Sequence, residues 1–244
     1  MKHKQALRQT LSFAVITIAV FLTAISCASV TRHEDDGHIG AVLNLSGVMW
    51  TTSFDEENNI VWEQINEDMT VTSNVGGSGS YIDGQLVFSI GSPSDKQSIA
   101  SFIPFCEENG YYRFLGEGLF FRNMNISAPE TMMSVLHYLT TPAGEFSRQY
   151  TVIRRCAADN ELDYVVYVYV DRDVTITADG TRHDSGYETL FTKYLDITLG
   201  AGWNALHLHL SQNNAEFALS IRLDDPLRMR WLTGEAHLRF VEEH

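Results

Sequence analysis

The stretch DYVVYVYVDRD, residues 163–173, is the strongest strand signal in the chain. Successive side chains of a β-strand point to opposite faces, and valine and tyrosine both favour strands. Here both faces are apolar, with Val165, Tyr167 and Tyr169 on one and Tyr164, Val166, Val168 and Val170 on the other. A strand that is apolar on both faces is covered on both. The stretch therefore predicts a central strand between two layers of the fold.

On either side of this stretch, short runs alternate apolar and polar residues, as in 85–90 (QLVFSI), 193–199 (KYLDITL), 203–210 (WNALHLHL) and 216–223 (EFALSIRL). Such alternation predicts strands with one buried and one wet face. Asp83-Gly84 is a hairpin-turn signal, and GGSGS (76–80) predicts a flexible turn. The run 129–139 approximates helical spacing, but the turn that follows at 141–146 favours a strand.

These patterns predict the fold class. About a dozen short strands are separated by turn signals, and no run gives a strong helix signal. A parallel α/β fold would need intervening helical patterns of about 10 or more residues. We therefore expect an all-β domain, a mostly antiparallel sandwich or barrel.

The N-terminus has the layout of a secretory signal peptide. Lys2, Lys4 and Arg8 precede the apolar run LSFAVITIAVFLTAISC (11–27), which ends in small residues. The run is short for a helix that stays in the bilayer, which needs about 18 to 20 apolar residues. The sequence Ala-Ile-Ser before Cys27 resembles the lipobox of bacterial lipoproteins. That resemblance implies that the signal helix is removed and that Cys27 is lipidated and becomes the new N-terminus.

The domain organisation follows from this leader. We expect a signal peptide at 1–26, the lipidated cysteine and a flexible tether at 27–40, and a single β domain at 41–244, with a split near residue 110 left open. Ala28 and Ser29 lack the Asp that retains many lipoproteins at the inner membrane, so the resemblance implies the outer membrane of a bacterial envelope. YVDRDVTITADG (169–180) and LGAGWNALHLHL (199–210) also resemble a pattern in uncharacterised β-rich bacterial lipoproteins, which implies the same fold and location.

The charge balance narrows the range of partners. The formal charge is −14, and loss of the leader's three positive residues makes the remainder more negative still. Such a surface repels phosphate backbones and anionic lipid heads, so nucleic acid is not an expected partner. Membrane attachment would come from the lipid on Cys27. The other expected partner is a protein, a glycan or a small ligand, and no cofactor is expected.

Cys106 and Cys156 are the cysteines left after Cys27. In an exported protein they could form one disulfide, which would close a loop of about 50 residues. The alternative is two separate buried thiols that pack as small apolar groups. The sequence leaves both readings open, because it does not give the Cα separation.

His207 and His209 are the best metal-ligand candidates. Residues i and i+2 of a strand lie on one face, so both imidazoles would project together. A zinc or copper site would need a third ligand, such as His237 or a carboxylate across the sheet. The alternative is the solvent-facing polar side of an amphipathic strand, and two ligands alone do not make a metal site.

A ligand-binding surface is predicted where Tyr167 and Tyr169 share a face with Asp171, close to Asp173. The two carboxylates could instead serve a carbohydrate-active enzyme as acid and base. GGSGS does not complete the G-x-S-x-G pattern of a nucleophile elbow. The first hypothesis is therefore a non-enzymatic binding or structural protein of the bacterial envelope. The alternatives are a calyx-like carrier of a hydrophobic ligand and a carbohydrate-active enzyme that uses Asp171 or Asp173.

Overall fold

The structure is a computed structural model, and it describes residues 37–57, 60–106, 110–115, 119–141, 148–155, 161–185, 188–192, 194–213, 216–223 and 230–233. Residues Gly37–His244 form one compact unit. The predicted signal helix, Cys27 and the tether before residue 37 lie outside the described residues. Within the described part, no helix combines the length and the apolar character that a membrane crossing requires.

The regular secondary structure of the described residues consists of one four-residue helix, α2 (Ile99–Phe102), and strands. The first half of the chain holds β1 (His38–Gly40), β2 (Leu43–Gly47), β3 (Met49–Phe54), β4 (Ile60–Gln64), β5 (Met69–Ser73), β6 (Ser78–Ile82), β7 (Gln85–Ile90), β8 (Gln97–Ser98), β9 (Phe105–Cys106), β10 (Tyr111–Phe114) and β11 (Leu119–Ile126). The second half holds β12 (Met132–Leu136), β13 (Leu139–Thr141), β14 (Arg148–Arg155), β15 (Glu161–Val170), β16 (Val174–Gly180), β17 (Arg182–Ser185), β18 (Glu188–Thr192), β19 (Leu195–Leu199), β20 (Gly202–Asn213), β21 (Glu216–Leu223) and β22 (Arg230–Thr233).

The all-β prediction is confirmed, with more strands than the expected dozen because several predicted runs divide. The run 129–139, for example, contains β12 and the first residue of β13. The strands form a branched 17-stranded sheet and a five-stranded sheet in the order β19-β16-β11-β10-β9. Among the described pairings only β18 with β21 and β22 with β3 are parallel. The prediction of a mostly antiparallel fold is therefore also confirmed.

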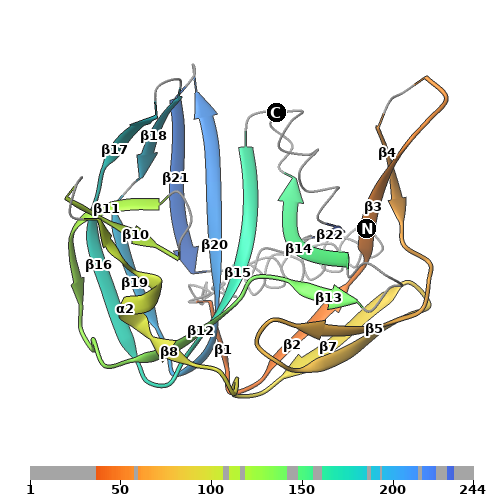
Figure 1. Cartoon of the computed structure of the whole chain (residues 1–244), viewed down its shortest axis with the longest axis horizontal. Coiled ribbons are helices and arrows are strands. Elements are labelled where there is room, and N and C mark those ends of the chain that lie inside the picture. The colour runs from red at the N-terminus through yellow and green to blue at the C-terminus, as the bar shows by residue number, and fades with distance from the viewer. Residues whose placement is uncertain are drawn as a thin grey trace, which may run out of the picture. The chain divides into compact units, whose positions relative to one another are not determined.

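Strands β15 and β20 form the centre of the fold (Figure 1). They pair antiparallel along the whole of β15, from Glu161 opposite Ser211 to Val170 opposite Gly202. One face of this pair contributes Val165, Tyr167, Trp203 and Ala205 to a first apolar cluster. The other face contributes Val168, Val170, Leu206 and Leu208 to a second cluster. The prediction of a central strand covered on both sides is therefore confirmed.

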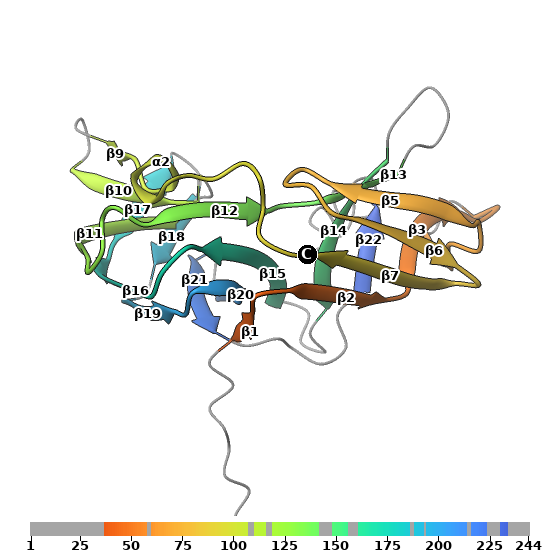
Figure 2. The ribbon, with the colours of Figure 1, turned by 90° about the horizontal axis from the view of Figure 1, so that it is seen from below.

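Two sets of strands cover the central pair, one on each face. The first cluster is completed mainly by β2, β5, β6 and β7, which supply Leu45, Val71, Tyr81, Leu86 and Phe88. The second is completed by the five-stranded sheet and α2, with Phe114, Phe121, Ile176, Ile197 and Ile99. Figure 2 shows β2, β5, β6 and β7 on one side of β15 and β20, and β10, β11, β16 and β19 on the other. Each cover buries the apolar face that its strands present, which is the main stabilising contribution in such a sandwich.

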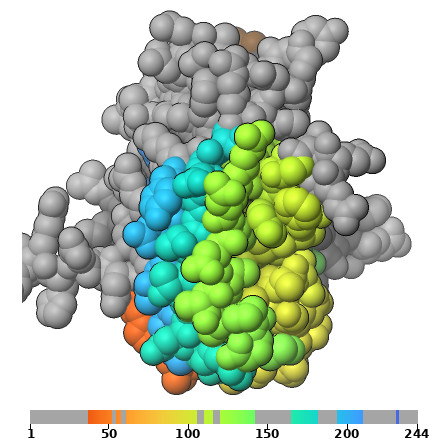
Figure 3. Space-filling model, turned by 90° about the vertical axis from the view of Figure 1, so that its left-hand side faces the viewer, coloured from red at the N-terminus to blue at the C-terminus, as the bar shows by residue number. Residues whose placement is uncertain are grey.

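The five-stranded sheet also forms part of the molecular surface. Figure 3 shows β11, β16 and β19 as adjacent bands on the side that lies at the left of Figure 1, in agreement with their pairing. Along β16 and β19, buried and more exposed residues alternate. The expected arrangement of one buried face and one wet face is therefore present here.

Local predictions have mixed outcomes. Asp83 and Gly84, with φ of 51° and 75°, form the two-residue turn between β6 and β7, as the sequence predicted. The run 129–139 contains strand β12, also as predicted. The prediction of a flexible turn over 76–80 is wrong in part, because β6 begins at Ser78. Gly79 belongs to this strand. A Cβ at this position would lie 2.3 Å from the Val87 carbonyl oxygen, so only glycine lets β6 approach β7 this closely.

Candidate binding surface

The two tyrosines predicted to bind a ligand lie on the core side of β15. Tyr167 is buried in the first cluster with 4% of its surface exposed, so a ligand at the surface does not reach it. Tyr169 is half-buried and packs edge-on against Trp203, with 5.5 Å between ring centroids. The Lys96 ammonium lies 5.3 Å from the centroid of the Tyr169 ring. These contacts make Tyr169 part of the packing beneath the segment that joins β7 to β8.

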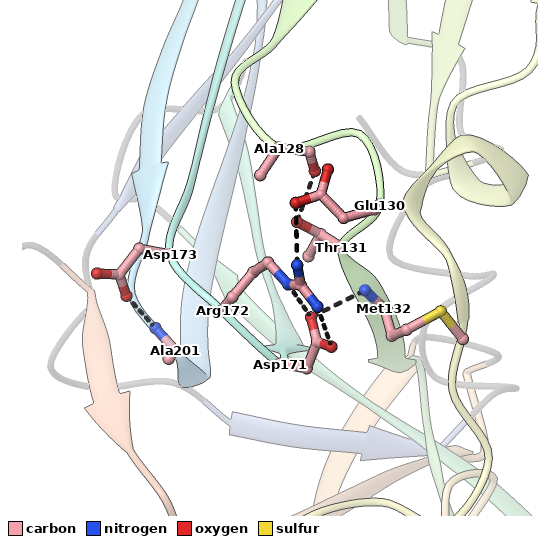
Figure 4. A network of polar contacts seen from close by, with 8 residues as sticks. All are labelled: Ala128, Glu130, Thr131, Met132, Asp171, Arg172, Asp173 and Ala201. Atoms are coloured by element: carbon pink, nitrogen blue, oxygen red, sulfur yellow. Dashed lines mark hydrogen bonds and ion pairs between the residues drawn. The ribbon is translucent and has the colours of Figure 1, made fainter.

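Asp171 is engaged at the end of β15 (Figure 4). Its carboxylate accepts a hydrogen bond of 2.9 Å from the Met132 backbone N–H. It also pairs with Arg172 at 3.3 Å, and Arg172 in turn pairs with Glu130 at 2.9 Å. Partial burial raises the pKa of the Asp171 carboxyl, but the Met132 hydrogen bond and the Arg172 charge outweigh it. The net pKa therefore lies below its ordinary value.

Asp173 points to a different element, and Figure 4 shows the two carboxylates directed apart. Its Oδ1 accepts a hydrogen bond of 2.8 Å from the Ala201 backbone N–H, in the turn between β19 and β20. The same turn is held from within by Asn204, which is fully buried and bonds to the backbone of Gly200 and Gly202. Asp171 and Asp173 therefore each hold a separate turn, and the structure does not bring them together as a catalytic pair.

His207 and His209 share one face of β20, as predicted, with ring centroids 6.5 Å apart. His207 is buried, with 5% of its surface exposed, and His209 is half-buried. The interpretation of this face as the solvent-facing side of the strand is therefore wrong for His207, which is buried on the face of β20 that also carries Trp203 and Ala205 of the first cluster. Among the described residues, no three His, Cys, Asp or Glu side chains lie close enough together to hold a metal ion.

Of the two cysteines that could form a bridge, only Cys106 belongs to the described residues. Cys106 belongs to β9, at the edge of the five-stranded sheet. Cys156 lies outside the described residues, as does His237, the third ligand suggested for a metal site. A disulfide between Cys106 and Cys156 and a pair of separate thiols therefore both stay as hypotheses.

A regular outward surface lies on the strands that cover the first cluster, at the lower right of Figure 1. Strands β2 and β7 alternate buried and exposed residues, and β5 repeats the pattern. The inward residues are mostly apolar, and the outward ones are almost all Ser, Thr, Asn or Gln. We call this outward surface of β2, β5, β6, β7 and β13 the uncharged face; it consists of Asn44, Ser46, Thr70, Thr72, Ser78, Ser80, Ile82, Gln85, Val87, Ser89 and Thr140.

The register of the five strands arranges this face in rows, because directly paired residues project from the same side of a sheet. One row crosses all five strands in the order Asn44, Ser89, Ser78, Thr72, Thr140. A second row crosses four strands in the order Ser46, Val87, Ser80, Thr70. Hydroxyl groups bond along the first row, with Thr72 Oγ1 2.8 Å from Thr140 Oγ1 and Ser89 Oγ 3.0 Å from Asn44 Oδ1.

The chemistry of this face differs from that of the rest of the chain. Charged residues make up 20% of the sequence, whereas these outward positions, all of them described, contain none. All are exposed except Ser80 and Thr140, which are half-buried. Val87 and Ile82 are 64% and 50% exposed, so two apolar side chains stand among the polar ones. The face offers hydroxyl and amide groups that both donate and accept hydrogen bonds, and no charge.

Sequence reasoning did not identify this face. The alternation of 85–90 was recognised, with Gln85 and Ser89 on the polar side. The available signal was that the outward positions of several neighbouring runs all hold uncharged polar residues. The sequence does not reveal that β13, which is distant along the chain, extends the first row through its pairing with β5.

No protein-family model matches the chain, and no curated protein or solved structure matches it significantly.

Proposed function

We propose that this chain is a lipid-anchored protein of the bacterial cell envelope whose β domain binds an external partner and catalyses no reaction. The basic n-region, the apolar run 11–27 and the small residues before Cys27 support the anchor. Ala28 and Ser29 after that cysteine favour the outer membrane. The observation that carries binding over catalysis is the uncharged face, an exposed and ordered surface without a carboxylate or imidazole.

The properties of Asp171 and Asp173 weigh against the enzyme alternative. A general acid in a glycosidase needs a pKa raised towards neutrality. The pKa of Asp171 is lowered instead, and the carboxylates of both residues are taken up by backbone N–H groups. If the protein binds without catalysis, Asp171→Asn and Asp173→Asn leave ligand binding unchanged. Loss of a measured hydrolytic activity in either variant would favour the enzyme.

The packing of the first cluster weighs against the carrier alternative. Side chains that line a ligand-sized cavity keep some accessible surface, since a probe fits beside them. Val71, Tyr81 and Leu86, on three of the strands that cover the cluster, have none. Native mass spectrometry of protein purified without lipid extraction tests this point, and a co-purified lipid at one copy per chain would favour the carrier.

The anchor is tested by expressing the full chain in a bacterium fed an alkyne analogue of palmitate. We expect the wild-type chain to be labelled and to sediment with membranes, and globomycin to leave the signal peptide attached. Cys27→Ser is the control, because it removes the acceptor thiol and leaves the rest of the leader intact. A wild-type chain that carries no label and keeps its full mass would refute the anchor.

A further inference from the structure

We infer that the uncharged face binds an uncharged polysaccharide. This inference deepens the proposed binding function and rests on it. The uncharged face holds no charged side chain. Without Lys or Arg it has nothing to neutralise a phosphate or sulfate, and without Asp or Glu it offers no oxygen cage for a hard cation. The partner that meets this surface at no electrostatic cost is itself uncharged.

The composition of the face also distinguishes a polysaccharide from a protein. The centres of protein–protein interfaces are enriched in aromatic residues, Met and Arg and are depleted in Ser. The uncharged face has the opposite composition, with Ser, Thr, Asn and Gln at most positions and no aromatic side chain. A serine or threonine hydroxyl donates one hydrogen bond and accepts others, as a sugar hydroxyl does. The two sets of groups can therefore pair without leaving an unmatched donor or acceptor.

The geometry fits an extended chain rather than a single sugar. The first row crosses five strands, and neighbouring strands are about 4.8 Å apart, so it is about 19 Å long. Val87, 64% exposed in the parallel second row, provides an apolar surface for the C–H groups of a sugar ring. The Thr72–Thr140 bond satisfies part of each hydroxyl and leaves acceptor capacity on both for a ligand.

The test is affinity electrophoresis of the full chain in non-ionic detergent, through native gels that contain laminarin, amylose, xylan or galactomannan. Gels with alginate or heparin provide charged polysaccharides of comparable size. We expect at least one of the neutral polysaccharides to retard the wild-type protein and neither charged one to do so. Thr72→Lys and Val87→Lys should each weaken the retardation about tenfold, because the ligand would have to desolvate an unpaired ammonium.

Thr198→Lys is the matched control. Thr198 is also an exposed threonine on a strand, and its hydroxyl lies 3.0 Å from that of Thr175 on the five-stranded sheet, away from the uncharged face. The substitution changes the net charge by the same amount as Thr72→Lys, so an effect of total charge would appear in both. We expect Thr198→Lys to bind like the wild type.

Four outcomes would overturn the inference. If no neutral polysaccharide retards the wild type, the ligand class is wrong. If the gels retard Thr72→Lys and Val87→Lys as strongly as the wild type, another surface of the protein binds the polysaccharide. The uncharged face is then not the binding site, although the proposed binding function still holds. Retardation by alginate or heparin would show a charged ligand. Self-association in sedimentation that Thr72→Lys abolishes would assign the face to a second copy of the chain. Labelling of Cys27 tests the anchor independently of all four.

Discussion

Asn204 should be among the most sensitive polar residues of the fold. Its Nδ2 donates to the carbonyl oxygens of Gly200 at 2.9 Å and Gly202 at 3.2 Å, and its Oδ1 accepts from the Gly200 N–H at 3.0 Å. The side chain is fully buried. It holds the turn that leads from β19 into the central strand β20. Any loosening of this turn is therefore transmitted to a strand that both apolar clusters share.

Asn204→Ala removes these three hydrogen bonds to the turn backbone, together with the longer 3.4 Å hydrogen bond between its Oδ1 and His38 Nδ1. At about 1 kcal/mol of net stability for each of the three bonds to the turn, we expect the free energy of unfolding to fall by about 3 kcal/mol. With an m-value of about 3 kcal/mol/M in urea, the midpoint would shift by about 1 M. Urea unfolding followed by tryptophan fluorescence measures this, because Trp203 and Trp231 are buried in the native state. Asn125→Ala, at an exposed position on β11, is the control and should change stability by less than about 0.5 kcal/mol.

Asn204→Asp keeps the shape of the side chain but places a carboxylate opposite two carbonyl oxygens. The buried, unfavourably placed charge raises the pKa of that aspartate in the folded state above its unfolded value of about 3.9. The stability of this variant is therefore highest below the unfolded pKa and is lost as pH rises through the folded one. We expect its deficit relative to the wild type to be smaller at pH 4 than at pH 7. A deficit independent of pH, or an alanine variant that loses less than about 1 kcal/mol, would refute this account of the turn.

Further substitutions test other parts of the same reasoning. Gly202→Ala should destabilise the protein by about 3 kcal/mol or more, because φ is +113° there and a Cβ would lie 2.5 Å from the Gly40 carbonyl oxygen. Gly91→Ala is the control: space is open around its Cβ position, so it should be nearly neutral in the same urea assay. Thr141→Val should raise the thermal midpoint, because the buried Thr141 hydroxyl has no hydrogen-bond partner among the described residues; an unchanged or lower midpoint would show that it has one. Asp171→Ala should lower the free energy of unfolding by about 1 kcal/mol at pH 7. Because the pKa of the Asp171 carboxyl in the folded protein lies below 3.8, that difference should persist above pH 3.8 and vanish as pH falls through the folded pKa. A difference that grows on acidification would contradict this expectation. Trp203→Phe should lower the free energy of unfolding by about 1 to 3 kcal/mol, because it leaves the Gly91 carbonyl without the indole N–H that donates to it at 2.8 Å. An unchanged stability in calorimetry would count against that hydrogen bond.

The class of the fold and its centre were predictable from sequence. The two apolar faces of residues 164–170 identified the central strand, since a period of two assigns each side chain to a face without knowledge of its neighbours. The Asp83-Gly84 turn was predictable for a related reason, because positive φ at two adjacent residues is a local property of the chain. These features depend only on residues adjacent in sequence.

The candidate sites were less predictable, because they depend on which strands become neighbours. Tyr167 and Asp171 share a face in any extended strand, but only the packing of β2, β5, β6 and β7 buries Tyr167. The carboxylates of Asp171 and Asp173 looked like a pair, yet each meets a backbone N–H from a different part of the chain. Burial and hydrogen-bond partners are set by long-range contacts, about which a single sequence says little.

By itself, the sequence determined that this chain forms antiparallel strands around one strand buried on both faces, because alternation of side chains is a short-range property. It also determined that Gln85 and Ser89 of β7 point away from the apolar face of that strand. Only the tertiary structure decided that the outward residues of neighbouring strands align in uncharged rows, since the alignment requires strand order and register. A slip of one residue in any pairing would turn apolar side chains outward and break the rows. Burial of the apolar faces against β15 and β20 selects the observed register, and that selection involves the whole domain.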